Sequence, residues 1–579
     1  MDLDNNKRRF SLPEIYFSFI KRRKLSDKLL FNVALIAVGF SILTAIFTAN
    51  HLFTRTFPTS GGTITEGIVG TPRFVNPVLA INRADHDMVA LVYSGLLKLD
   101  EKGDLVPDLA ESIVLSEDGK TYHIILRKGV KFHNGLELKA RDVVYTIALI
   151  QNPELKSPLR GNWDGVVVQE INDYELTIVL QEAHAPFKEN LTVGILPREL
   201  WDALPIEQVP FSQNNTEPIG TGPYMLKEVL RNKSGLINGY TLEAFSASNY
   251  KPNITKLAFK FYQNEEELLS ALGKKEITST PSLSLENLSR VDRSTYNIIT
   301  TPLPRTFGIY LNQNKSAALR DISVRRALNA AINKKGLVDL VLFGYGKETN
   351  SPVPPGFLNT EESSSTSTAV TVNPIEKAQS ILRDGGWKKT EAGTWEKEID
   401  RNKVTLSVSL STANTPLFDQ TATKIAEIWK SIGVDVHVSQ FEQTDLVQSV
   451  IRPRDFEALL YGADIGRQVD LYPFWHSSQK NDPGLNIGQY TNIEVDALLT
   501  KLRMKDDEAT KAETVGLVER MIQDDVPTIF LFVPMFGYVL DNRVQGVELS
   551  KLSKQSERFA NVSKWHIKSS NVWPIFSHN

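Results

Sequence analysis

The chain has 579 residues, 41% of them hydrophobic and 23% charged, and its formal net charge is −3. This length exceeds what one hydrophobic core accommodates, so we expect several lobes or domains. The small net charge, with no interleaving of basic and aromatic residues, gives no reason to expect nucleic-acid binding. The absence of cysteine excludes disulfides, thiolate metal sites, cysteine nucleophiles and a lipid-modified cysteine, so that any membrane attachment must be made by the polypeptide itself.

The first predicted element is the segment from Leu29 to Asn50, which has no charged side chain. As a helix with a rise of about 1.5 Å per residue it reaches roughly 33 Å, enough to cross a hydrocarbon core about 30 Å thick. Eight basic residues precede it and only Arg55 follows closely, which places the N-terminus in the cytoplasm. We therefore predict a cytoplasmic segment (1–28), a transmembrane anchor (29–52), a linker (53–62) and an extracytoplasmic remainder.

Two alternatives to an anchor stay open at this point. A cleaved signal peptide has a shorter apolar region, of about 7–15 residues, and Thr48-Ala49-Asn50 is a poor cleavage site. A buried core helix is the other alternative.

Beyond the linker the pattern changes to alternating strands and helices. Apolar and polar residues roughly alternate in Thr121–Leu126 and Tyr174–Leu180, which predicts half-buried strands. Ala317–Leu342 and Ala422–Ile432 carry apolar residues at helical spacing. Mixed α/β lobes are therefore expected, and an all-β sandwich or a helical array is excluded. Glu361–Ser367 is a low-complexity stretch that predicts an exposed loop.

Ten short runs resemble, in the same order, those of one known family. They are Gly61–Pro77, Tyr93–Leu97, Leu105–Ser112, Asp118–Gly135, Arg141–Tyr145, Gly220–Tyr224, Tyr310–Asn312 with Val324–Ala331, Tyr472–Gln479, Asp525–Pro534 and Arg558–Trp565. Together they resemble the bacterial extracellular solute-binding proteins, family 5, which serve oligopeptide, dipeptide and nickel importers. The resemblance covers about residues 61–570. Taken alone, the run Gly220–Tyr224 (GTGPY) predicts only a tight turn, next to which the Tyr224 ring could face a cleft.

The resemblance implies a two-lobed, periplasmic-binding-protein-like α/β fold of the class II type, in which one lobe carries an extra subdomain. Ligand would be held between lobes that close on a hinge. We expect the chain to cross between lobes at Thr301–Gln313 and Val526–Val539. Residues 63–305 would then form lobe I with the extra subdomain, residues 306–525 lobe II, and residues 526–579 the return to lobe I.

The resemblance also implies how a ligand would be bound. In peptide-binding relatives the ligand adds to the protein as a strand, and a carboxylate on the second lobe meets its amino group. Asp464 is at the matching position and is our candidate amine partner, with Tyr461 lining a side-chain pocket. The alternative for Asp464 is that it caps a turn before Ile465.

Other candidate ligand-binding residues rest on weaker grounds. Trp475, followed by His476, is as compatible with a cleft wall as with the core. Tyr93, Tyr224 and Arg305 are candidates by position alone. The run from Arg467 to Asp470 departs from the family pattern, which leaves Asp470 as a substitute carboxylate.

The predicted function is that of a membrane-anchored, extracytoplasmic substrate-binding protein of an ABC importer, which delivers peptides to permease subunits. By analogy it is a monomer, and no cofactor is expected. One alternative is a nickel-chelate receptor, although the nine histidines include no close pair at ligand spacing. A tethered peptide sensor is another. An enzyme is disfavoured because the chain lacks a Gly-x-Ser-x-Gly elbow, a His-Glu-x-x-His motif and a phosphate-binding loop.

Overall fold

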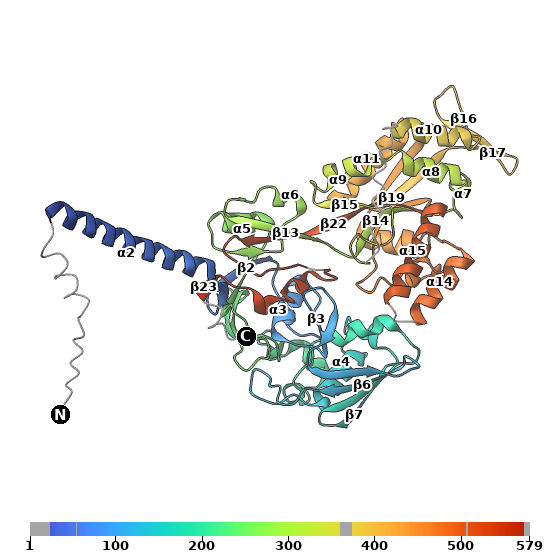
Figure 1. Cartoon of the computed structure of the whole chain (residues 1–579). Helices are drawn as coiled ribbons and strands as arrows, with labels where there is room; N and C mark the ends of the chain where they lie inside the picture. Colours follow the sequence, from blue (N-terminus) through green and yellow to red (C-terminus); the bar gives the residue numbers. More distant parts are fainter. Residues whose placement is uncertain (1–23, 54, 359–372, 505–507, 550, 573–579) are drawn as a thin grey trace, which may run out of the picture. The chain divides into compact units, whose positions relative to one another are not determined.

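The computed structural model describes residues 24–53, 55–358, 373–504, 508–549 and 551–572 (Figure 1). It divides into two compact units, Met1–Thr59 with Lys568–Asn579, and Ser60–Ile567. Most of the predicted cytoplasmic segment and the predicted loop Glu361–Ser367 lie outside the described residues.

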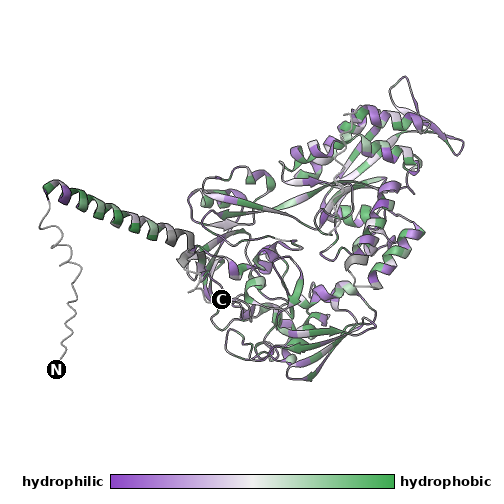
Figure 2. Cartoon of the chain, in the orientation of Figure 1, coloured by the Kyte–Doolittle hydropathy of each residue, from purple (hydrophilic) through white to green (hydrophobic). Residues whose placement is uncertain are grey.

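The smaller unit holds the apolar helix and a two-stranded ribbon. Helix α2 (Leu25–Phe53) is apolar enough and long enough over Leu25–Thr48 to cross a membrane, and its apolar window is not buried in the protein, which contradicts the alternative of a core helix. Figure 2 shows this helix as a long hydrophobic run. The predicted linker contains a strand, β1 (Arg55–Thr59), which pairs antiparallel with β23 (Lys568–Val572); the bounds of the linker stay a prediction.

In the larger unit, one long strand joins two groups of strands. The N-terminal part of β22 (Thr528–Asp541) pairs with β14 (Arg305–Leu311), and its C-terminal part pairs with β13 (Tyr296–Pro302) (Figure 1). The strand order is β20-β19-β21-β14-β22-β12-β2-β11-β10-β9, and β13 and β15 also pair with β22. The remaining bounds are β2 (Thr63–Val69), β9 (Tyr224–Arg231), β10 (Ile237–Ala244), β11 (Lys256–Tyr262), β12 (Ser279–Thr280), β15 (Gly346–Glu348), β19 (Ser407–Ala413), β20 (Asp435–Phe441) and β21 (Ala458–Asp464).

A separate antiparallel sheet forms within the first 200 residues. Its order is β5-β6-β8-β7, and the bounds are β5 (Ala110–Leu115), β6 (Thr121–Leu126), β7 (Val167–Asn172) and β8 (Glu175–Val179). In β6 the residues Tyr122, Ile124 and Leu126 are buried while their neighbours are not, as the alternation predicts. Helix α4 (Ala140–Gln151) contributes Val143 and Ile147 to the same core. Both strands predicted in this region are confirmed, β8 with one residue fewer at each end.

The helix predicted over Ala317–Leu342 is three shorter helices. They are α7 (Ala317–Arg320), α8 (Ile322–Ala330) and α9 (Lys334–Val341). Asp321 accepts a hydrogen bond from the Ser323 N–H, and Asn333 accepts one from the Gly336 N–H, so each of these side chains caps a new helix. The helix predicted at Ala422–Ile432 is part of α11 (Pro416–Ser431).

Hydrophobic cores form on both sides of β22. One large cluster draws on residues 64–259 and 536–565, and two further clusters draw on residues 307–532. These clusters fit a two-lobed α/β fold; the residue boundaries of the lobes stay predictions. The other elements are α3 (Arg83–Val92), β3 (Leu97–Leu99), β4 (Leu105–Pro107), α5 (Glu265–Gly273), α6 (Leu285–Leu288), α10 (Pro374–Asp384), β16 (Lys388–Lys389), β17 (Trp395–Ile399), β18 (Asn402–Thr405), α12 (Gln443–Asp445), α13 (Tyr472–Trp475), α14 (Ile493–Met504) and α15 (Glu508–Asp525).

Candidate ligand-binding site

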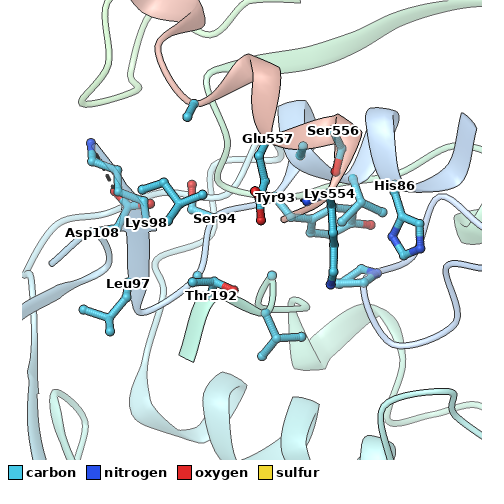
Figure 3. A pocket seen from close by; sticks show the side chains of 18 of the residues that line it. His86, Tyr93, Ser94, Leu97, Lys98, Asp108, Thr192, Lys554, Ser556 and Glu557 are labelled. Atoms are coloured by element: carbon cyan, nitrogen blue, oxygen red, sulfur yellow. Dashed lines mark hydrogen bonds and ion pairs between the residues drawn. The ribbon is translucent and has the colours of Figure 1, made fainter. Parts of the chain in front are cut away.

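A cavity of about 260 Å³ lies in lobe I. Its walls come from α3, the β3–β4 hairpin, the short 3-10 helix η2 (Ala185–Thr192) and a C-terminal segment that includes the 3-10 helix η8 (Gln555–Phe559). Figure 3 shows Lys554 and Glu557 of that segment pointing into the cavity toward Tyr93 and Thr192. Apolar walls with a few inward polar groups are typical of a small-ligand site.

Tyr93, one of the predicted residues, lines this cavity directly after the end of α3. Its side chain is buried, its hydroxyl donates to the Val75 carbonyl at 3.4 Å, and burial raises its pKa. The helix before it is fixed by a capping box between Asn82 and Asp85. Tyr93 is therefore a rigid part of the wall, and direct contact with a ligand stays a prediction.

The GTGPY run holds the end of α3 in place. A Cβ at Gly220 or Gly222 would overlap the main-chain oxygens of Val92 or Leu91, so this close approach requires glycine. Tyr224 is wrong as a cleft residue, because its ring is fully buried and its hydroxyl donates to the Ile254 carbonyl at 2.9 Å.

His133 hydrogen-bonds to the main chain of the GTGPY run. Its Nδ1 accepts from the Gly220 N–H at 3.3 Å, and its Nε2 lies 3.1 Å from the Gly222 carbonyl, to which a protonated Nε2 donates. This pattern needs a neutral imidazole, because protonated Nδ1 cannot accept a hydrogen bond. Burial lowers the pKa of His133 to about 4, although the hydrogen bond to Gly222 opposes the shift.

We expect His133 to make the protein less stable as the pH falls from about 6.5 to 4. In that window the unfolded chain binds a proton at this imidazole and the folded chain does not, so the free energy of unfolding falls by up to about 2 kcal/mol as the pH is lowered. Urea unfolding of the wild type and His133→Gln at pH 7 and pH 4.5 measures the effect. An equal loss of stability in both proteins would contradict it, since His86 and His184 are common to the two.

Two predicted residues meet at the end of the β14–β21 strand pair. Arg305 and Asp464 are opposite each other in the antiparallel pairing of β14 with β21, and Arg305 Nη2 lies 3.3 Å from Asp464 Oδ2. Both side chains stay about half exposed, at 47% and 44%. Asp464 also accepts from the Gly466 N–H at 3.2 Å, so the predicted alternative of a turn cap is present as well. The Asp464 carboxylate therefore caps a turn, pairs with a counterion and is still accessible to solvent.

The main chain near Asp464 has a free side. β21 pairs with β19 only at Ala458 and Leu459, although β14 continues alongside to Asp464. Among the described residues, no strand pairs with Tyr461–Asp464 on the side away from β14. Tyr461, half-buried, lies in this stretch. An extended ligand has unused main-chain donors and acceptors here.

The other predicted residues of lobe II are engaged in contacts within the protein. Trp475 is wrong as a cleft wall, because its ring is buried against Tyr310, Phe530 and Tyr490 with centroids 5.8–6.5 Å apart. Asp470 forms an ion pair with Arg503 at 2.6 Å. His476 stacks on Tyr472 with centroids 4.1 Å apart. Within the described ranges, no three His, Asp or Glu side chains are grouped so that they could hold a metal ion.

Sequence reasoning missed three charged residues that link the two lobes. Arg467 follows β21 on lobe II. Its guanidinium pairs with Glu189 and Glu557, which line the cavity of lobe I. The only signal was the departure of residues 467–470 from the family pattern.

A model of the bacterial extracellular solute-binding proteins, family 5 (middle region), matches residues 104–483 of this chain. The chain belongs to this family. Its family-5 relatives include the oligopeptide-binding protein AppA of Bacillus subtilis (strain 168), 26% identical over 563 residues that cover 94% of this chain and 99% of the relative. The nickel-binding periplasmic protein of Escherichia coli (strain K12) is 28% identical over 376 residues, covering 62% and 67%.

A solved structure of a family-5 protein shares the fold of this chain. The structure of Bacillus subtilis AppA in complex with a nonapeptide is 25% identical, has a TM-score of 0.63, and covers 88% of this chain and 100% of that chain. The two-lobed architecture is thus established.

Proposed function

We propose that this family-5 protein is the membrane-anchored, extracytoplasmic receptor of an ABC importer, and that it captures peptides and delivers them to permease subunits. The observation that carries the proposal is the half-exposed Asp464 carboxylate at the end of β21, where Tyr461–Asp464 have no strand partner on the side away from β14 among the described residues. A peptide with a free amino terminus can supply a partner for each: its extended backbone can pair with the free main chain, and its ammonium group can bind the carboxylate.

The ligand would lie along β21 with its amino terminus at Asp464. A charge-assisted hydrogen bond between an ammonium and this carboxylate favours ligands with a free amine. Arg305 balances the charge of Asp464 in the free protein and moves aside or shares the carboxylate on binding. Side chains of the ligand would enter the lobe I cavity near Tyr93.

Helix α2 would hold the receptor at the membrane. Its apolar length, the seven basic residues before it and Lys28 near its start support an uncleaved anchor with a cytoplasmic N-terminus. The intact mass of the mature chain distinguishes this from a cleaved signal peptide. Action as a receptor rather than an enzyme, and as a monomer, belongs to the same proposal.

A thermal-shift screen of the full chain in detergent tests the proposal. We expect short peptides to raise the unfolding temperature, because a ligand that binds only the folded state stabilises it. A nickel–histidine chelate is screened in parallel. A shift with the chelate and none with peptides would move the assignment to nickel uptake, and no shift with either would contradict a receptor for these ligands.

A further inference from the structure

Arg467 projects from lobe II on a firmly anchored loop. Ile465 and Val469, on either side of it, are buried in a lobe II core, and the Ile465 N–H donates to the Pro304 carbonyl at 2.9 Å. The side chain between these anchors is only 7% exposed. A charged side chain held in this way needs several partners to offset its desolvation.

All of its partners lie on the other lobe. Nη1 donates to the carbonyls of Gly103 at 3.0 Å and Lys551 at 2.6 Å, and Nη2 donates to the Glu557 carboxylate. Nε lies 3.9 Å from Glu189 Oε1. Gly103 belongs to the β3–β4 turn, so three separated segments of lobe I converge on one guanidinium.

The two carboxylates in this set are part of the cavity wall. Glu557 is fixed by the main-chain N–H groups of Ser553 and Lys554, which donate to Oε2 at 2.6 and 3.1 Å. Glu189 Oε1 is buried and has no hydrogen-bond partner in the described part of the chain. Burial raises the pKa of Glu189, which the nearby Arg467 charge opposes. Without Arg467 the Glu189 and Glu557 carboxylates, whose side chains are 32% and 19% exposed, would lose the cation that pairs with both of them, leaving Lys554 and Lys511 as the positive charges near Glu189.

We propose that Arg467 sets the ligand specificity of the cavity: it supplies the cation that the Glu189–Glu557 wall requires, and thereby excludes basic ligand side chains from that wall. The same contact ties lobe II to lobe I at the edge of the cavity. The role of Arg467 toward the two carboxylates is independent of the proposed receptor function. Only the statement that the excluded ligand is a peptide rests on that function.

Removing the guanidinium should leave a vacant cation-binding site at this wall. In Arg467→Ala we expect the Glu557 carboxylate to stay in place, because the main-chain N–H groups of Ser553 and Lys554 still hold it, and Glu189 and the two carbonyls to remain on the same side of the cavity. A free guanidinium or a lysine side chain of a ligand can then occupy the site.

The first experiment uses ethylguanidinium and needs no knowledge of the ligand. We expect millimolar ethylguanidinium to raise the unfolding temperature of the full-length Arg467→Ala protein and not that of the wild type. The effect should disappear in the triple variant Arg467→Ala, Glu189→Gln, Glu557→Gln. Arg503→Ala is the matched control, because its partner Asp470 lies within lobe II. No stabilisation of Arg467→Ala, or equal stabilisation of Arg503→Ala, would overturn the proposal.

The second experiment compares two tripeptides that differ only in a central lysine or norleucine. We expect Arg467→Ala to shift the affinity ratio at least about 10-fold toward lysine relative to the wild type, and Arg467→Lys to keep the wild-type ratio. An unchanged ratio in Arg467→Ala would overturn the proposal while leaving peptide binding intact. If the wild type binds no peptide, the receptor function fails, and the ethylguanidinium result still decides the role of Arg467.

Discussion

Replacing Arg558 by methionine is expected to lower the free energy of unfolding by about 3–5 kcal/mol, the usual effect of removing one partner from a buried ion pair. The Arg558 side chain is fully buried and binds Asp87 through two parallel hydrogen bonds of 2.7 and 2.8 Å, and it also binds Glu66. Without it, two carboxylates with side chains 3% exposed or less lose their counterion. Equilibrium urea unfolding measures the loss.

Two further variants identify the cause. Arg543→Met removes an arginine that pairs equally well with Asp541 but is 73% exposed, and it should cost under about 1 kcal/mol. The triple variant Glu66→Gln, Asp87→Asn, Arg558→Met removes every charge and should recover much of the stability. If Arg558→Met were no more harmful than Arg543→Met, the network would have no structural importance.

Asp464→Asn is expected to weaken the binding of a peptide with a free amino terminus about 10- to 100-fold, because a hydrogen bond to a charged group contributes roughly 1.5–3 kcal/mol. The substitution keeps the size of the side chain and its ability to accept from Gly466, and it removes only the charge. Isothermal titration calorimetry with a free and an N-acetylated form of the same peptide measures the change.

Acetylation should weaken binding strongly in the wild type and much less in Asp464→Asn, since the two changes remove the same interaction. Asp470→Asn is the matched control, because that carboxylate is held by Arg503 within lobe II. If acetylation weakened binding equally in the wild type and in Asp464→Asn, the amino group would be recognised elsewhere.

Local features of the fold could be predicted from the sequence. The strand at Thr121–Leu126 follows from alternation alone, because one face is buried and the other is not. The helices around Asp321 and Asn333 were predicted as one, since their apolar spacing is continuous and only the caps interrupt it. The ribbon of Arg55–Thr59 with the C-terminal strand could not be predicted, because its partner is more than 500 residues away.

The site shows the same division. Asp464 and Arg305 were each found by position, but their ion pair depends on a strand register between residues 159 apart. Trp475 and Tyr224 were misassigned because an aromatic residue near a motif packs into a core as readily as it lines a cleft. Arg467 interrupts a familiar pattern, and its partners on three segments of lobe I become evident only in the folded chain.

Native mass spectrometry of the full chain, released from detergent without refolding, tests the central claim most directly. We expect a series of bound peptide masses that is strongly reduced in Asp464→Asn and retained in Asp470→Asn. A protein that carries only a nickel chelate, or whose bound peptides are unaffected by Asp464→Asn, would contradict a peptide receptor that recognises the amino terminus at this carboxylate.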